Sequence, residues 1–70
     1  MNASDFKPGD QVIYMPGIAY GNPTHPACER GVVSSTNGVN VFVRYWVKYG
    51  NETKLSATAQ ATSPDDLVLL

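Results

Sequence analysis

VNVFVRYWVKY, residues 39–49, is the longest run of strand-forming residues in this chain of 70 residues. Alternate side chains of a strand point to opposite faces of a sheet. One face carries Val41, Val43, Tyr45, Val47 and Tyr49. The other face carries Phe42, Arg44, Trp46 and Lys48. Because arginine and lysine are rarely buried without a partner, we expect the valine-rich face to point inward and the Phe-Arg-Trp-Lys face to point outward.

The rest of the chain also has the pattern of short strands separated by turns. Four more segments are rich in strand-forming residues: DQVIYM (10–15), GVVSS (31–35), ETKLSAT (52–58) and LVLL (67–70). Asn37-Gly38 predicts a type I′ hairpin turn, since both residues tolerate a positive φ, and Gly50-Asn51 predicts a similar turn. No long segment repeats apolar residues at helical spacing.

Two connections differ from these tight turns. TSPDDL (62–67) predicts one helical turn, in which Ser63 is the cap, Pro64 takes the first helical position and the aspartates lie near the positive end. PGIAYGNPTHPACER (16–30) predicts a long loop between the first and second strands. Loops of this length are uncommon in small domains and are frequently functional.

Five short strands, a long first loop and one helical turn before the last strand are typical of a small SH3-like barrel. We therefore predict an all-β fold, a five-stranded SH3-like barrel over residues 7–70, with residues 1–6 as a flexible N-terminal tail. Closure of the sheet would hide most of its edges. Because a chain this short has a marginal core, self-association into a homo-oligomer is also consistent with the sequence.

Charge and composition limit the classes of partner. Five Lys and Arg residues stand against six Asp and Glu residues, for a formal net charge of −1, whereas proteins that bind duplex DNA tightly normally have a basic surface. A single cysteine cannot close an internal disulfide and fits a reducing compartment. The sequence begins without a signal-peptide pattern and has no apolar run near the roughly 20 residues that cross a bilayer. We expect a cytoplasmic protein with no membrane partner.

The predicted outward face of residues 42–48 combines two aromatic rings with two cations. Phe42 and Trp46 suit stacking on the bases of a single-stranded nucleic acid, while Arg44 and Lys48 suit its phosphates. The same residue types are frequent in the energetic centres of protein interfaces. A third interpretation is that the long loop or the termini cover the two rings.

The stretch THPACERGVVSS (24–35) contains the only histidine and the only cysteine of the chain. His25 and Cys28 are both zinc-binding residue types, but a closed structural site needs four ligands and no second histidine or cysteine is present. A cysteine nucleophile would also need an orienting group, an oxyanion hole and a cleft. We therefore predict no metal, no cofactor and no enzymatic activity.

The same loop is suited to binding. Its prolines reduce the entropy lost when a ligand binds. His25 and Glu29 offer hydrogen-bonding groups, and Arg30 can bind a phosphate or a carboxylate with two hydrogen bonds. A structural interpretation stays open beside this one, in which Cys28 packs as a small apolar residue and the polar side chains bond to the loop itself.

The motifs GDQVIYMP, HPACERGVVSS, VFVRY and ATSPDDLVLL follow one another along the chain. Together they resemble a group of small phage and prophage proteins, in which Gly-Asp-x-Val leads to His-Pro-x-Cys-Glu-x-Gly-Val-Val-Ser-Ser, a Val-Phe-Val-Arg-aromatic strand and a closing Pro-x-Asp-Leu. The first and last motifs also resemble SH3-like barrels of the KOW and Tudor types. Members of the group carry a Trp-Glu-Gly-like segment and a second cysteine where this chain has KYGNETKLSATAQATSPDDL.

The resemblance implies a barrel of phage or mobile-element origin and brings no catalytic residues. We predict a non-catalytic phage-type accessory protein that contacts a host protein during host takeover, as an inhibitor of defence or of nucleic-acid machinery. One alternative is a nucleic-acid-binding module of KOW or Tudor type. Another is an oligomer that binds a nucleotide-like small molecule. The candidate partner-binding residues are His25, Glu29, Arg30, Phe42, Arg44, Trp46 and Lys48.

Overall fold

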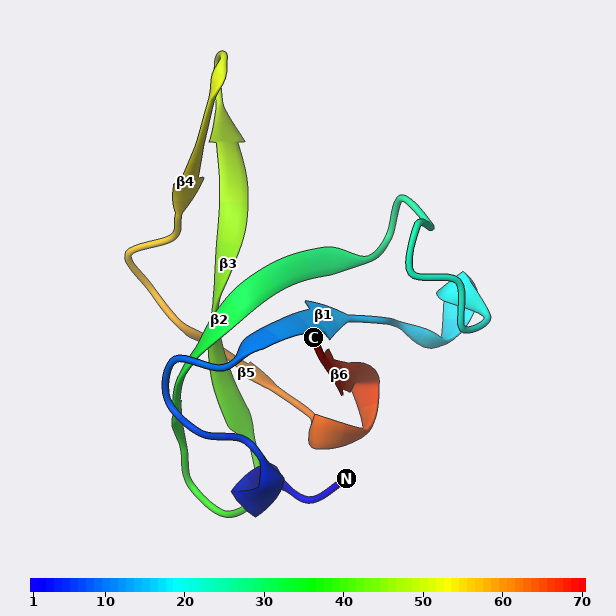
Figure 1. Ribbon diagram of the computed structural model, residues 1–70, viewed down its shortest axis with the longest axis vertical. Coiled ribbons are helices and arrows are strands. Elements are labelled where there is room, and N and C mark those ends of the chain that lie inside the picture. Colours follow the sequence, from blue (N-terminus) through cyan, green and yellow to red (C-terminus); the bar gives the residue numbers. More distant parts are fainter.

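Six antiparallel strands and three single-turn 3-10 helices make up the computed structural model, which describes residues 1–70 (Figure 1). The strands are β1 (Gln11–Tyr14), β2 (Glu29–Thr36), β3 (Val41–Tyr49), β4 (Glu52–Leu55), β5 (Gln60–Thr62) and β6 (Leu67–Leu69). The helices are η1 (Ala3–Asp5), η2 (Gly17–Ala19) and η3 (Pro64–Asp66). The prediction of an all-β fold is confirmed.

The strands follow the order β4-β3-β2-β1-β6, and β5 pairs with the first half of β3. The predicted fourth strand over residues 52–58 is wrong in its extent, because β4 ends at Leu55 and β5 was not predicted. Between the two strands the Ser56 N–H still donates to the Tyr45 carbonyl, at 2.8 Å. The chain then bends at residues 57 and 58 before it pairs with β3 again. This interruption allows two short strands to follow one long, twisted strand.

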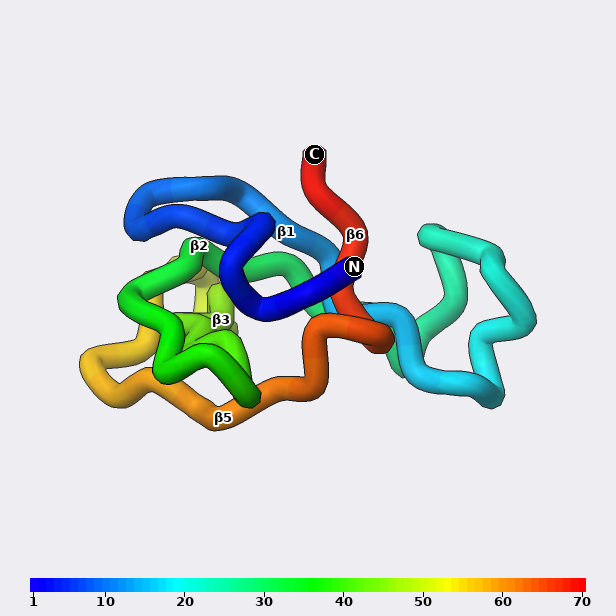
Figure 2. The backbone as a smooth tube through the Cα atoms, turned by 90° about the horizontal axis from the view of Figure 1, so that it is seen from below, coloured from blue at the N-terminus to red at the C-terminus, as the bar shows by residue number.

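The sheet curls around its apolar side but does not close (Figures 1 and 2). β6 pairs only with β1, while β4 and β5 pair only with β3. The predicted closure into a barrel is therefore not observed. Both outer edges of the sheet keep unpaired backbone groups.

The predicted hairpin turns are present, but neither has the type I′ geometry. Gly38 has a φ of +87° and Gly50 a φ of +61°, whereas neither Asn37 nor Asn51 has a positive φ. The Asn37 side chain instead accepts hydrogen bonds from the backbone N–H groups of Val39 and Asn40, at 3.0 and 2.7 Å. At the turn between β3 and β4, Gly50 has a positive φ and Asn51 does not, which is the type II′ pattern.

η3 confirms the predicted helical turn before the last strand. The Ser63 hydroxyl accepts a hydrogen bond from the Asp65 N–H at 3.3 Å, and Pro64 is the first helical residue. The Asp66 carbonyl accepts from the Met15 N–H at 2.7 Å. The turn is thereby fixed against the end of β1.

The core lies on the inner side of the curled sheet. Its buried members are Ala3, Phe6, Val12, Val33, Val41, Val43, Tyr45 and Leu67. Residues 1–6 were predicted to be a flexible tail. They nevertheless contribute two of these side chains, and each is only 2% exposed. The packed domain therefore includes the N-terminal segment, which lies at the end of the sheet where β2 turns into β3 (Figures 1 and 2).

Gly31 allows a close approach between β2 and β3 at the centre of the core face. Gly31 is buried and pairs with Tyr45. A Cβ atom at Gly31 would lie 2.5 Å from Val43 Cγ1, 2.8 Å from the Arg44 carbonyl oxygen and 3.1 Å from Tyr45 Cδ1. Only glycine leaves room here for the side chains of β3.

Candidate binding surfaces

The two faces of β3 follow the predicted alternation as far as Tyr45. The buried residues are Val41, Val43 and Tyr45, and the half-buried ones are Phe42 and Arg44. Beyond this point Val47 is half-buried and Tyr49 is 64% exposed. The prediction is therefore confirmed for residues 41–45 and wrong for Tyr49, because the end of the strand extends past the core.

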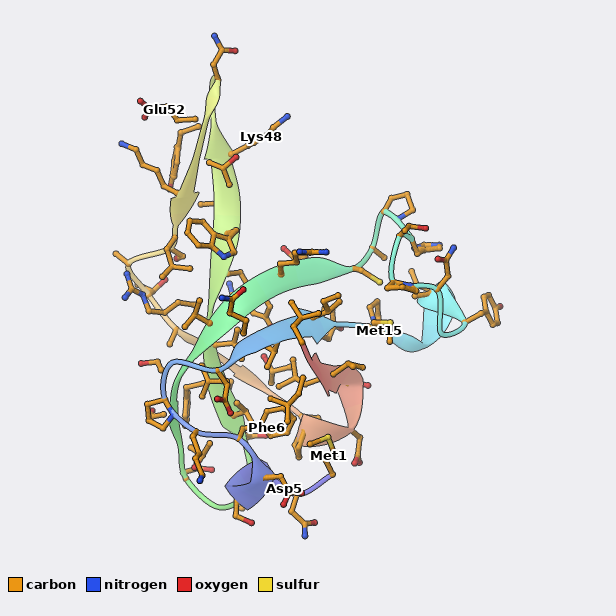
Figure 3. The ribbon with its side chains drawn as sticks, viewed as in Figure 1. Met1, Asp5, Phe6, Met15, Lys48 and Glu52 are labelled. Carbon is orange, nitrogen blue, oxygen red and sulfur yellow. The ribbon has the colours of Figure 1, made fainter.

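β4 and the second half of β3 form a hairpin that projects from the body of the protein (Figure 1). Lys48 and Glu52 lie near its tip (Figure 3). The pairing between β3 and β2 ends at Tyr45 and Gly31, so residues 46–49 have no partner strand on that side. A two-stranded hairpin of this kind exposes both its faces and both its edges.

Five of the predicted binding residues share one face of the sheet. The pairing of Val32 with Arg44 places Arg30, two positions earlier on β2, on the same face as Arg44. We call this the outer face, and it carries Arg30, Phe42, Arg44, Trp46 and Lys48. It holds three of the five Lys and Arg residues of the chain. Trp46 is 45% exposed there.

Arg44 is held in place on the outer face. Its Nε donates a hydrogen bond to the Ser56 carbonyl at 2.7 Å, and the side chain is half-buried. Arg44 therefore links the outer face to the segment between β4 and β5. Arg30 and Lys48 are exposed and form no ion pair.

The long loop between β1 and β2 folds upon itself and lies to one side of the sheet, away from the projecting hairpin (Figures 1 and 2). Backbone hydrogen bonds of 2.9 to 3.1 Å connect Asn22 to Ala19, His25 to Asn22 and Cys28 to His25. Ile18 and Tyr20 are exposed on it, at 63% and 92%. The loop leaves Trp46 45% exposed.

His25 and Cys28 both bond to the loop that contains them. The His25 Nδ1 accepts from the Ala27 N–H at 3.0 Å. The Cys28 thiol donates to the Asn22 carbonyl at 3.4 Å. These contacts agree with the structural interpretation of this pair. No group of three or more His, Cys, Asp or Glu side chains is placed to hold a metal ion.

Glu29 is separated from the other predicted residues. It pairs with Tyr14 across the first position of β2 and so points to the same side of the sheet as Gly31 and the core. Because the core ends at this point, the Glu29 side chain is exposed. The predicted set is therefore divided among the loop, the outer face and the open end of the core face.

A groove of about 320 Å³ opens at this end of the core face. It is lined by the Tyr14 and Tyr45 rings, by residues 60–63 of the β5 segment, and by Glu29 and Asp66. The two tyrosine rings are in edge-to-face contact, with centroids 6.3 Å apart and planes at 72°. The groove is the one cavity of this fold.

Tyr45 forms the inner wall of the groove. Its hydroxyl lies 2.8 Å from the Thr62 hydroxyl, and both residues are buried. Burial is the main cause that raises the pKa of Tyr45 above its ordinary value of 10.0. The hydrogen bond with Thr62 opposes this shift, whereas the nearby charges of Glu29 and Asp66 increase it. Both carboxylates line the groove together with Tyr45.

No local pattern in the sequence predicts this groove. The residues around Asp66 predict only a helical turn, and no pattern separates residues 60–62 as a strand of their own. The available signal was that Tyr14 and Tyr45 stand at inward positions of strands that are otherwise aliphatic. That pattern indicates a polar end of a core, but it does not show which carboxylates will face the rings.

The structure contains no helix that could span a membrane. No protein-family model, curated protein or solved structure matches this chain.

Proposed function

We propose that this chain is a non-catalytic accessory protein of phage type, which binds a host protein in the cytoplasm of the host cell. We also propose that the fold is of the SH3-like type. The strand order, the long loop after β1 and the single helical turn before β6 support that assignment. The phage origin rests on the sequence motifs that resemble phage and prophage proteins.

The observation that carries the proposal is the outer face. It gathers Trp46, which is 45% exposed, with three cations on one side of the sheet, and none of the three forms an ion pair. Tryptophan and arginine are enriched among the residues that dominate binding energy in protein interfaces. Because this face is cationic, we expect the partner to present an acidic surface.

A single-stranded nucleic acid is a second candidate partner, and the same face favours it. Trp46 can stack on a base, while Arg30 and Lys48 can contact phosphates. Two observations limit this candidate. The net charge of the chain is −1, and the Arg44 Nε is already engaged by the Ser56 carbonyl. The nucleotide-like ligand has less support, because Arg30 lies outside the groove and carboxylates line the groove.

A pull-down from bacterial lysate, with and without nuclease, tests the proposal. The bait variant Trp46→Ala with Lys48→Ala removes one aromatic ring and one cation from the outer face. Tyr49→Ala with Lys54→Ala is the matched control, because it removes the same kinds of side chain from the opposite face of the same hairpin.

We expect the wild type and the control to retain a protein that survives nuclease treatment, and the outer-face variant to lose it. A captured species that disappears with nuclease would instead assign the face to nucleic acid. Equal retention by all three baits, or no retained species at all, would contradict the proposal.

A further inference from the structure

We propose that the groove between Tyr14, Tyr45, Glu29 and Asp66 receives a basic side chain, an arginine or a lysine, from the protein partner. This inference deepens the proposed function and rests on it for the nature of the partner. The outer face and the groove lie on opposite sides of the sheet, so the groove would add a second, chemically different contact.

The two carboxylates of the groove have no cation of their own. The ion pair of this chain is between Lys54 and Glu52, at 3.2 Å on the projecting hairpin. Glu29 and Asp66 form no ion pair, and their carboxylates accept no hydrogen bond from the protein. Two unneutralised carboxylates at the rim of one cavity create a negative potential inside it.

Tyr14 and Tyr45 form the closely packed part of the groove wall. The two rings are in edge-to-face contact, with their planes at 72°, so each ring restricts the movement of the other. The hydrogen bond from Tyr45 to Thr62 fixes one of the rings. The groove is therefore partly preorganised.

The size and polarity of the groove agree with the guanidinium group of an arginine or the ammonium group of a lysine. A volume of about 320 Å³ lies at the lower end of the range for small-ligand pockets. A bare metal ion is not favoured, because two carboxylates are fewer ligands than closed metal sites use and no group of three is present. An anion is not favoured either, because the groove has no cationic residue.

The test is a titration of the 15N-labelled full chain with three model compounds. Binding is measured by NMR from the chemical shifts of the backbone amides of residues 60–63. Nα-acetyl-arginine amide and Nα-acetyl-lysine amide carry the cation. Nα-acetyl-citrulline amide has nearly the shape of the arginine compound without its charge. For ligands of this size we expect dissociation constants on the order of millimolar.

The variants are Glu29→Gln, Asp66→Asn and the matched control Asp65→Asn. Asp65 is the exposed neighbour of Asp66 in η3 and does not line the groove. We expect each groove variant to weaken binding of the cationic compounds by about tenfold, and the control to bind as the wild type does. Circular dichroism of each variant confirms that its fold is retained.

Equal shifts with citrulline, no shifts with either cation, or an equal loss in the Asp65 variant would overturn the inference. These outcomes do not depend on the pull-down, because the titration needs no partner protein. Conversely, a failed pull-down with a positive titration would reject the outer face as a docking surface and leave the groove as a cation site.

Discussion

The Tyr45 hydroxyl and the Thr62 hydroxyl, 2.8 Å apart, join β3 to β5 inside the protein. The sheet does not close, so this hydrogen bond helps to hold β5 over the open end of the core. The same contact fixes the ring that forms the inner wall of the groove. Stability and the shape of the candidate cation site therefore depend on one side-chain pair.

Tyr45→Phe should lower the free energy of unfolding by about 1 to 2 kcal/mol, because it leaves the buried Thr62 hydroxyl without its main partner. Urea denaturation followed by the fluorescence of Trp46, the single tryptophan, measures this change. Tyr49→Phe is the matched control, since its hydroxyl is exposed and makes no hydrogen bond to the protein, and it should change stability by less than about 0.5 kcal/mol. Equal stability of the two variants would show that the contact contributes nothing.

Alkaline pH should weaken the folded protein through the same residue. Burial, and to a lesser degree the neighbouring carboxylates, raise the pKa of Tyr45 above 10.0. The unfolded chain therefore loses this proton at a lower pH than the folded protein does, so the free energy of unfolding falls as pH rises above 10. Below about pH 9 the contribution is fully present.

The difference in stability between the wild type and Tyr45→Phe isolates this effect, because the variant keeps every other titrating group. We expect the difference to be constant from neutral pH to about pH 9 and to shrink above pH 10. Urea denaturation at a series of pH values measures it. A difference that stays constant or grows at high pH would show that the folded protein does not resist ionisation of Tyr45.

Gly31→Ala should destabilise the protein by about 1 to 3 kcal/mol or more, because the new methyl group would overlap Val43 and the backbone of β3. Gly17→Ala is the control: no atom lies within 4 Å of its Cβ position, and its φ is not positive. Thermal melts of both variants beside the wild type measure the change. A melting temperature of Gly31→Ala equal to that of the control would mean that β2 and β3 are further apart than described.

Local patterns predicted much of the fold. The alternation along residues 41–45, the cap at Ser63 and the glycine turns each follow from residue type and spacing, and each is present. The division of the fourth strand did not follow from pattern, because it depends on how β3 twists in three dimensions. The prediction of a type I′ turn at Asn37-Gly38 was also wrong. The Asn37 side chain instead accepts hydrogen bonds from two backbone N–H groups of the turn.

The candidate sites were less predictable than the fold. Alternation placed Phe42, Arg44, Trp46 and Lys48 on one face, but strand pairing was needed to add Arg30 and to remove Glu29. The groove joins residues that are up to 52 positions apart, from Tyr14 to Asp66. No local spacing contains that information.

Phe6→Ala should destabilise the protein by about 3 to 5 kcal/mol, because the Phe6 side chain is 98% buried in the core cluster (2% exposed). In a chain this short that loss approaches the whole stability, so the milder Phe6→Leu provides a measurable step of about 1 kcal/mol. Lys7→Ala, next to it and exposed, is the control and should behave as the wild type does. Urea denaturation of the three variants measures the free energy of unfolding of each and so ranks them by stability. If Phe6→Ala were as stable as Lys7→Ala, residues 1–6 would be a tail outside the domain and the core would have to be closed by other side chains.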